Sequence, residues 1–274
     1  MSRPWIFICP SSRGIGFHLT RYLLQTTAFP ILATTRSQCE TLRARLLNSL
    51  PSSTDPSRLE LLPLDVTSEP TIAAAAAFAT NRFPSDRFHL HLAFALPGVL
   101  RPERSPGQIN GESALEMMRV NVVGVELLMK HFGGFLPRKG ASRALALGLD
   151  WGQGKGRLPD QALWVNMGAR VGSISDNRLG GWFSYRASKA GLHSLTKSMD
   201  HWLRSRSGDR AMVVAYHPGT VKTDLSREFW ESSAAGGTLM EPETAVKKMT
   251  GVIAALKLEQ RGKCWDWKGK EVPP

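Results

Sequence analysis

Seven short apolar runs, alternating with segments of helical periodicity, constrain the fold of this chain more than any other feature. Each run has the length and composition of a buried strand. A helix between two such strands returns the chain so that the strands run parallel. The sequence therefore predicts α/β architecture, with a doubly wound, mostly parallel seven-stranded sheet and helices on both faces. The expected strands are 5–9, 30–36, 59–64, 88–95, 162–167, 211–216 and 263–267.

Two segments interrupt this alternation within what we expect to be one domain, residues 1–274. Residues 138–160 contain several glycines and predict a surface excursion, with a short strand at 144–147 as one alternative. Residues 225–241 are rich in glycine and serine and form a candidate lid. The expected helices are 38–50, 72–80, 112–132, 184–206 and 243–258, with a further helix opening after Gly14.

Composition narrows the classes of function. No apolar run approaches the roughly 18 residues that a membrane span needs, so no span is expected. The net charge is +12, but the basic residues are dispersed and no nucleic-acid-binding motif is visible, so no nucleic acid is expected. Three widely spaced cysteines favour a reducing, cytoplasmic location, and the absence of acidic residues before Glu40 leaves a mitochondrial presequence as the alternative. No metal ligands are expected.

The first strand is followed by a glycine-containing turn that opens a helix. Residues 10–16 read Pro-Ser-Ser-Arg-Gly-Ile-Gly, and Phe17, Leu19 and Leu23 follow with helical spacing. Small residues at such a turn let the backbone approach a pyrophosphate, and the free N–H groups of the helix start can bind it. The turn therefore predicts a Rossmann-type dinucleotide site, although a plain glycine turn before a helix has the same pattern.

Two side chains at the next strand ends bear on which dinucleotide binds. Arg36 ends the second strand, where an acid would accept from a ribose 2′-OH and a cation would accommodate a 2′-phosphate. Arg36, with Arg13, therefore favours NADP(H) over NAD(H), unless Arg36 is only a solvent-facing strand end. Asp65 closes the third strand and can cap the following helix, accept from an adenine amine, or do both.

The chemistry is expected on the helix at 184–206. Tyr185 and Lys189 are four residues apart, so they lie on one side of that helix. A neighbouring ammonium stabilises phenolate, and we therefore expect Lys189 to lower the pKa of Tyr185 and make it a general acid/base. Asn121 lies in an apolar run of another helix, where a buried amide needs a partner. His89 and His91 alternate along the fourth strand and are expected at an edge.

Together these motifs resemble the short-chain dehydrogenase/reductase family, and most of all its C-factor-like and carbonyl-reductase-like members. The resemblance covers nearly the whole chain. It rests on Gly172-Ser-Ile-Ser-Asp-Asn177, Gly180-Gly-Trp182, Tyr185-Arg-Ala-Ser-Lys189, His217-Pro-Gly-Thr-Val221 and Trp265-Asp-Trp267.

The resemblance implies roles for individual residues. Tyr185 would exchange the proton at a carbonyl or alcohol group while NADP(H) exchanges hydride with its carbon. Lys189 would bind the nicotinamide ribose, and Asn121 would anchor a water in the proton relay. The backbone of Val221 and Thr223 would hold the carboxamide. The cofactor contacts would come from Ser11, Ser12, Arg13, Gly14, Ile15, Gly16, Arg36, Asp65, Val66, Ala95, Tyr185, Lys189, Pro218, Gly219, Val221 and Thr223.

Three departures from the family pattern affect these expectations. Pro10 stands in the glycine loop and removes one backbone N–H donor. Ala95-Leu96 replaces two amides that follow the fourth strand. Ala169 replaces the serine that binds the substrate carbonyl, and losing such a donor lowers the rate by about 10²–10³. Ser173, twelve residues before Tyr185, is a candidate substitute.

These observations leave more than one functional hypothesis. The first is an NADP(H)-dependent oxidoreductase that acts on a small carbonyl or alcohol substrate. The rival is an NADP(H)-binding sensor or scaffold with little or no catalysis, favoured by Ala169. A third, binding to an anionic surface or to nucleic acid, rests only on the charge of +12. The resemblance also implies a homo-oligomer through the helices that carry Asn121 and Tyr185.

Overall fold

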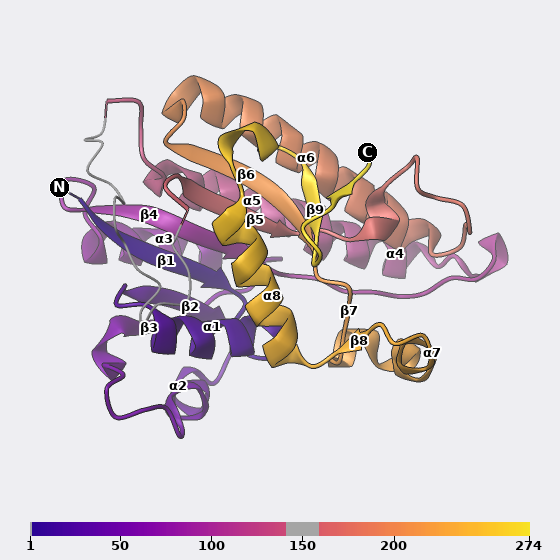
Figure 1. The fold of residues 1–274 in the computed structure, drawn as a ribbon, viewed down its shortest axis with the longest axis horizontal. Helices are drawn as coiled ribbons and strands as arrows, with labels where there is room; N and C mark the ends of the chain where they lie inside the picture. The colour runs from indigo at the N-terminus through magenta and orange to yellow at the C-terminus, as the bar shows by residue number, and fades with distance from the viewer. Residues whose placement is uncertain (1, 141–158) are drawn as a thin grey trace.

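The computed structural model describes residues 2–140 and 159–274, and an eight-stranded sheet lies at its centre (Figure 1). The strand order is β10-β9-β6-β5-β4-β1-β2-β3, and every pair from β9 to β3 is parallel. The predicted doubly wound, mostly parallel sheet is therefore confirmed. Its strands are β1 (Arg3–Cys9), β2 (Ile31–Thr35), β3 (Leu59–Pro63), β4 (Phe88–Ala95), β5 (Ala162–Met167), β6 (Ala211–His217), β9 (Cys264–Asp266) and β10 (Glu271–Val272).

All seven expected strands are present, and β10 is an eighth that the sequence did not indicate. It contains two residues, pairs antiparallel with β9 through Glu271 and Trp265, and lies at the edge of the sheet. A strand of two residues is too short to show the alternation by which strands are found. The prediction of seven strands is therefore one strand short at the C-terminal edge.

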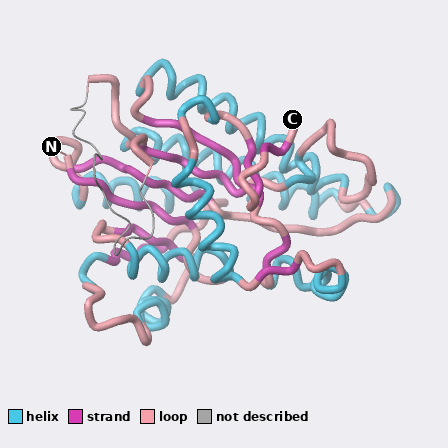
Figure 2. The backbone as a smooth tube through the Cα atoms, in the orientation of Figure 1, coloured by secondary structure: helices cyan, strands magenta, loops and turns pink. Residues whose placement is uncertain are grey.

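Helices cover both faces of the sheet (Figures 1 and 2). The apolar side chains between the sheet and these helices are buried in two core clusters. One core cluster joins the sheet to α1 (Gly14–Thr26), α2 (Cys39–Leu47) and α8 (Pro242–Ala255). The other cluster joins it to α3 (Glu69–Arg82), α5 (Gly124–Phe132) and α6 (Phe183–Ser207). The short 3-10 helices are η1 (Pro56–Arg58), η2 (Pro106–Gln108), η4 (Gly133–Phe135), η5 (Arg170–Gly172), η6 (Asp224–Phe229) and η7 (Leu258–Gln260).

The strand order reverses between β1 and β4, which are neighbours in the sheet although β2 and β3 lie between them in sequence. In open α/β sheets such a reversal leaves a crevice at the carboxyl ends of the strands, and ligands bind there. The Leu96 N–H donates to the Cys9 carbonyl at 2.7 Å and joins the two strand exits. The turn after β1 and the turn after β4 therefore meet at this edge.

The helix expected at 112–132 is interrupted by one π-helical turn. It consists of α4 (Gly111–Met118), the π-helical segment η3 (Arg119–Val123) and α5, and η3 contains Asn121. Gly124 packs so closely on Val66 that a Cβ there would lie 2.9 Å from the valine Cβ. Single π-helical turns inside α-helices are frequent at functional sites.

The candidate lid at 225–241 has regular structure. It contains most of η6, all of α7 (Trp230–Ala235) and strand β8 (Leu239–Met240), which pairs with β7 (Thr220–Val221) outside the main sheet. Figure 1 shows this unit beyond the carboxyl ends of the strands of the large sheet. Closure of this segment over a ligand stays a prediction.

Two further expectations concern strand β4 and the segment 138–160. His89 and His91 were expected at an edge, which is wrong, because β4 lies between β1 and β5 and both side chains are buried. The expected strand at 144–147 lies outside the described residues, as does most of the excursion at 138–160. Among the helices that the structure describes, none is long and apolar enough to cross a membrane.

Candidate active site

Tyr185 and Lys189 lie one helical turn apart near the start of α6, as the sequence predicted. Both are buried, with 7% and 2% of their surface exposed. The Lys189 ammonium donates to the Met167 carbonyl at the end of β5 over 2.7 Å, and its Nζ lies 5.8 Å from the centroid of the Tyr185 ring. The phenol and the amine therefore both lie at the carboxyl edge of the sheet.

The expected effect on the pKa of Tyr185 is wrong for this arrangement. Burial raises the pKa of Tyr185, because a buried phenolate would lose its hydration. Burial also lowers the pKa of Lys189 to about 8. The reason is geometric: the ammonium is directed to the Met167 carbonyl, and the phenol packs among apolar side chains.

Asn121 has the partners that a buried amide requires. Its Oδ1 accepts from the Val99 N–H at 2.8 Å, and its Nδ2 donates to the Val99 carbonyl and to the Ser188 hydroxyl, both at 3.0 Å. Ser188 in turn donates to the Tyr185 carbonyl at 2.8 Å. Asn121 therefore ties η3, the turn after β4 and α6 together, while its role as anchor of a relay water stays a prediction.

The surroundings of Tyr185 are apolar. Met117 and Ala169 form one buried cluster with it, and Trp182 packs against that cluster with its ring centroid 6.1 Å from the tyrosine ring. Trp182 also contacts Phe229 of the candidate lid, with ring centroids 4.8 Å apart. Ala169 thus lies in contact with the tyrosine cluster without a hydroxyl group. The remaining members of this environment are Val99, Leu100 and Val171.

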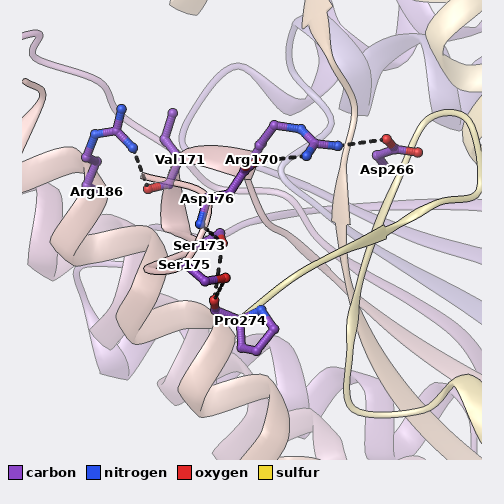
Figure 3. A network of polar contacts seen from close by, with 8 residues as sticks. All are labelled: Arg170, Val171, Ser173, Ser175, Asp176, Arg186, Asp266 and Pro274. Atoms are coloured by element: carbon purple, nitrogen blue, oxygen red, sulfur yellow. Dashed lines mark hydrogen bonds and ion pairs between the residues drawn. The ribbon is translucent and has the colours of Figure 1, made fainter. Parts of the chain in front are cut away.

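Ser173, the candidate substitute for the missing serine, is engaged elsewhere. Its hydroxyl donates to the Pro274 carbonyl at 3.3 Å and accepts from the Asp176 N–H at 3.0 Å (Figure 3). Ser175 also donates to the Pro274 carbonyl, and Arg170 forms ion pairs with Asp176 and Asp266. This network holds the segment after β5 against the C-terminal strands. A catalytic role for Ser173 stays a prediction, since it would have to exchange these partners.

The glycine loop fits the phosphate groups of a dinucleotide. A Cβ on Gly16 would lie 1.9 Å from the Pro10 carbonyl oxygen, and Gly14 has a φ of +53°, so both positions require glycine. Helix α1 begins without a side-chain cap, and its first turn contains no acidic residue. Its first N–H groups are therefore available to an anion. Ser11 is buried and accepts from Thr20, and Ile15 packs against the core.

Arg36 and Asp65 lie near each other at the ends of β2 and β3. Arg36 is exposed, and its charge contributes to lowering the pKa of Asp65, although the Thr67 N–H is the largest cause. Asp65 Oδ1 accepts from the Thr67 N–H and hydroxyl, both at 2.8 Å. This aspartate therefore braces the turn before α3; a contact with adenine stays a prediction.

The loop after β6 reaches back to the glycine loop. Thr223 Cγ2 would lie 3.2 Å from a Cβ placed on Gly14, so the two loops are adjacent across the crevice. Gly219 has a φ of +75°, and a Cβ there would meet Met240 and Trp267 at 2.8 Å. The loop that contains Pro218, Gly219, Val221 and Thr223 therefore lies beside the glycine loop, and its contact with a cofactor stays a prediction.

Glu103 supports the helix that carries Tyr185, and the sequence did not indicate this role. It is 3% exposed; its carboxylate accepts from the Ser184 N–H at 2.8 Å and from the Ser184 hydroxyl at 2.6 Å, while its carbonyl accepts from the Trp182 N–H at 2.6 Å. Trp182 itself does not cap α6 with its side chain. Glu103 thus caps the helix of Tyr185 from a distant loop. No local pattern in the sequence signals a cap that is 81 residues away.

The fold is similar to that of known reductases. The carbonyl reductase Sniffer of Drosophila melanogaster superposes with a TM-score of 0.78 and 22% identity over all of both chains. An NADPH-bound carbonyl reductase from chicken fatty liver does so with a TM-score of 0.78 and 26% identity, also over all of both chains. A 3-oxoacyl-[acyl-carrier protein] reductase from Brucella melitensis in complex with NAD has a TM-score of 0.71, 17% identity and coverage of 98% and 97%.

Sequence comparison agrees with the structural one. C-signal of Myxococcus xanthus is 36% identical over 105 residues, which are 38% of this chain and 57% of that protein, so less than two thirds of that relative is covered. An uncharacterised oxidoreductase of Schizosaccharomyces pombe is 22% identical over 97% of this chain and 96% of its own length. No family model matches the chain. The expected resemblance to short-chain dehydrogenases/reductases is nevertheless confirmed, by the fold over the whole chain and by these relatives.

Proposed function

We propose that this protein is an NADP(H)-dependent oxidoreductase that interconverts a small carbonyl compound and its alcohol. The observation that carries the proposal is the buried pair Tyr185 and Lys189, held at the carboxyl edge of the sheet beside a glycine loop suited to phosphate groups. The carbonyl reductases of similar structure support the same reaction class, and the chicken enzyme is NADPH-bound.

The residues of this chain divide the chemistry between them. Bound NADP(H) would supply or accept the hydride. Tyr185 donates its phenolic proton to the carbonyl oxygen in reduction and removes it in oxidation. Lys189 supplies positive charge behind the phenol and returns the proton to it, and Asn121 fixes η3 against α6 so that this geometry is kept.

Arg36 supports NADP(H) as the preferred cofactor. It is an exposed cation at the end of β2, where the second strand of such a fold meets the adenosine ribose. A charge-assisted hydrogen bond to a 2′-phosphate contributes about 1.5–3 kcal/mol. We expect Arg36→Ala to weaken NADPH binding by about 10-fold to 100-fold and NADH binding much less. Equal losses for the two cofactors, measured by fluorescence titration, would exclude this role.

The proposed function is tested by cofactor oxidation. Purified protein is incubated with NADPH and a panel of aldehydes, ketones and quinones, and absorbance at the reduced-cofactor band is followed. Tyr185→Phe is the control, because it keeps the ring and removes the acid; the expected loss is about 10²–10⁴-fold. Wild-type oxidation that never exceeds this variant would end the enzymatic proposal.

Ala169 favours a second candidate, a cofactor-binding sensor or scaffold. It packs in the Tyr185 cluster where a hydroxyl would hold a substrate carbonyl, and Ser173 is engaged with Pro274 and Asp176. In that case NADPH binds measurably, while the panel shows turnover close to that of Tyr185→Phe. Calorimetric titration with NADPH, run beside the oxidation assay, separates the two candidates.

Association of two or more copies stays a proposal. The helical segment with Asn121 and the neighbouring α4 expose Leu115, Met118 and Val123, which are 61%, 38% and 44% accessible, and α6 exposes Trp202 at 45%. Such apolar side chains on adjacent helices suit a contact between copies of the chain. Sedimentation of wild type and of Leu115→Glu tests it, because a charge in that contact would shift the distribution to monomer.

A further inference from the structure

Two buried imidazole nitrogens without partners lie in the region behind Lys189. Within the described residues, His193 Nε2 and His217 Nδ1 are shut off from solvent and have no hydrogen-bond partner. A buried polar atom of this kind normally binds a protein group or an ordered water. Both histidines are only partly buried as residues, so part of each residue is open to solvent.

The backbone places His193 beside Lys189. Tyr185, Lys189 and His193 follow at intervals of four, so the three side chains share one side of α6. Lys189 donates to the Met167 carbonyl, and a Cβ on the next residue, Gly168, would lie 3.0 Å from His193 Nε2. The ammonium and the imidazole therefore flank the same peptide at the end of β5.

Two glycines after β5, Gly168 and Gly172, leave room for the His193 ring and the backbone of α6. A Cβ on Gly172 would meet His193 Cε1 at 2.9 Å and the Lys189 carbonyl oxygen at 2.8 Å, and one on Gly168 would also meet Cys264 Sγ at 3.3 Å. The segment after β5 thus packs directly on His193. These contacts fix the ring between the lysine and the C-terminal strands.

The groups that face the two histidines come from every neighbouring element. Lys189 lies on α6, Cys264 and Asp266 on β9, and Arg170 on η5; Asp266 is opposite His217 in the register of β6 and β9. Loss of hydration is the largest cause that favours neutral imidazole, and the neighbouring cations add to it, while Asp266 opposes it at His217. The pKa values of His193 and His217 are lowered to about 4. Among the described residues no group of His, Cys, Asp and Glu is arranged to hold a metal ion.

We propose that His193, with His217 beside it, forms a proton path from Lys189 to solvent. The inference rests on the proposed function, since only turnover at Tyr185 creates a demand for protons at Lys189. It is independent of the relay through Asn121, whose amide hydrogens are both used by Val99 and Ser188. His193 touches neither substrate nor cofactor and acts through Lys189.

The proton balance of the path is simple. In reduction, Tyr185 gives its proton to the substrate oxygen and takes one from the Lys189 ammonium. The neutral lysine then accepts the proton of one His193 ring nitrogen, while the other ring nitrogen takes up a proton from the solvent side. No charge accumulates on the imidazole, because it changes tautomer. The path requires an ordered water at each free nitrogen to connect the imidazole to its neighbours, the kind of partner that a buried polar atom normally has.

The test compares His193→Asn with His201→Asn, a control on the exposed side of the same helix. With NADPH and a carbonyl substrate that wild type reduces, we expect His193→Asn to lower kcat by about 10²-fold, to leave KM for NADPH unchanged and to shift the pH profile of kcat. Added free imidazole should restore much of the rate. The control should behave as wild type throughout.

With an active wild type, either of two outcomes would overturn the path. One is a folded His193→Asn with the kcat and pH profile of wild type; another is a loss that imidazole does not restore and that His193→Gln reproduces with a raised KM, as a packing defect would. If His193→Asn does not fold, His193→Gln is measured in its place against the same criteria. An inactive wild type would remove both the path and the proposed function, whereas an active wild type with an unaffected variant would remove only the path.

Discussion

Tyr185 and Lys189 are neighbours on one helix, but the two sides of the pair differ in chemistry. The side around Tyr185 consists of Ala169, Met117, Trp182 and other apolar groups. The side behind Lys189 contains imidazoles, a thiol and an Arg170–Asp266 ion pair. The structure therefore offers abundant proton carriers behind the lysine and few hydrogen-bond donors for a substrate oxygen. In the proposed reaction, proton supply and carbonyl binding would therefore depend on different residues.

The largest effect should come from placing a donor on the apolar side. We expect Ala169→Ser to raise kcat for carbonyl reduction by about 10²–10³, because the added hydroxyl can donate to the developing oxyanion. The side behind Lys189 is untouched, so the shape of the pH profile should stay the same. Steady-state kinetics with NADPH and an aldehyde measure both. Ala169→Gly is the control, because it changes the volume without adding a donor.

A wild type already as fast as the serine variant would contradict the comparison. In that case, a donor outside the described apolar cluster, or a rearrangement of Ser173, would hold the substrate oxygen. Ala169→Ser combined with Ser173→Ala separates these alternatives. A serine effect that survives the second change would assign the binding of the oxygen to position 169.

The next largest effect is on stability in acid, and it comes from His91, a buried histidine that is remote from Lys189. Burial lowers the pKa of His91 to about 4 from an ordinary value of 6.5. The unfolded chain therefore binds more protons between these values, and the stabilisation is present above pH 6.5 and is lost as the pH falls toward 4. From pH 7 to pH 5 this one group should lower the free energy of unfolding by roughly 2 kcal/mol.

Urea unfolding of wild type and His91→Gln at pH 7 and pH 5 measures this effect. The glutamine variant should be less stable at pH 7, where it loses the contact of His91 with the Pro159 carbonyl, but should lose less on acidification. Its kcat profile should match that of wild type, in contrast to the profile expected of His193→Asn. An equal acid loss in both proteins would mean that other groups carry it.

Features of this molecule that depend on residues close in sequence could be predicted, whereas features that depend on contacts between distant residues could not. Strands such as 162–167 and the helix of Tyr185 were found because period and composition are local properties. The glycine loop was found for the same reason. A hydrogen-bond partner was expected for the Asn121 amide. That the partners are Val99 and Ser188 depends on how η3, α6 and the turn after β4 pack together.

What the sequence could not indicate depends on tertiary packing. The pKa of Tyr185 was expected to fall because the spacing of Tyr185 and Lys189 was known, whereas the direction of the ammonium and the apolar cluster around the phenol were not. His89 and His91 alternate as edge residues do, and only the strand order shows that β4 is central. The role of Glu103 could not be predicted for the same reason, since its partner Ser184 is far away in sequence.

Glu103 gives the smallest expected effect and the sharpest check on the apolar side. Its carboxylate is the buried charge that holds the start of α6, one residue before Tyr185. We expect Glu103→Ala to lower the free energy of unfolding by about 1 kcal/mol, as loss of a helix cap does. Glu103→Gln keeps an acceptor for the Ser184 hydroxyl and should lose less stability.

If the Glu103 carboxylate acts only by position, both variants should lower kcat in proportion to their loss of stability and leave the pH profile of kcat unchanged. A shifted profile in the glutamine variant would show that its charge reaches the phenol, and the tyrosine side would then be less apolar than the packing indicates.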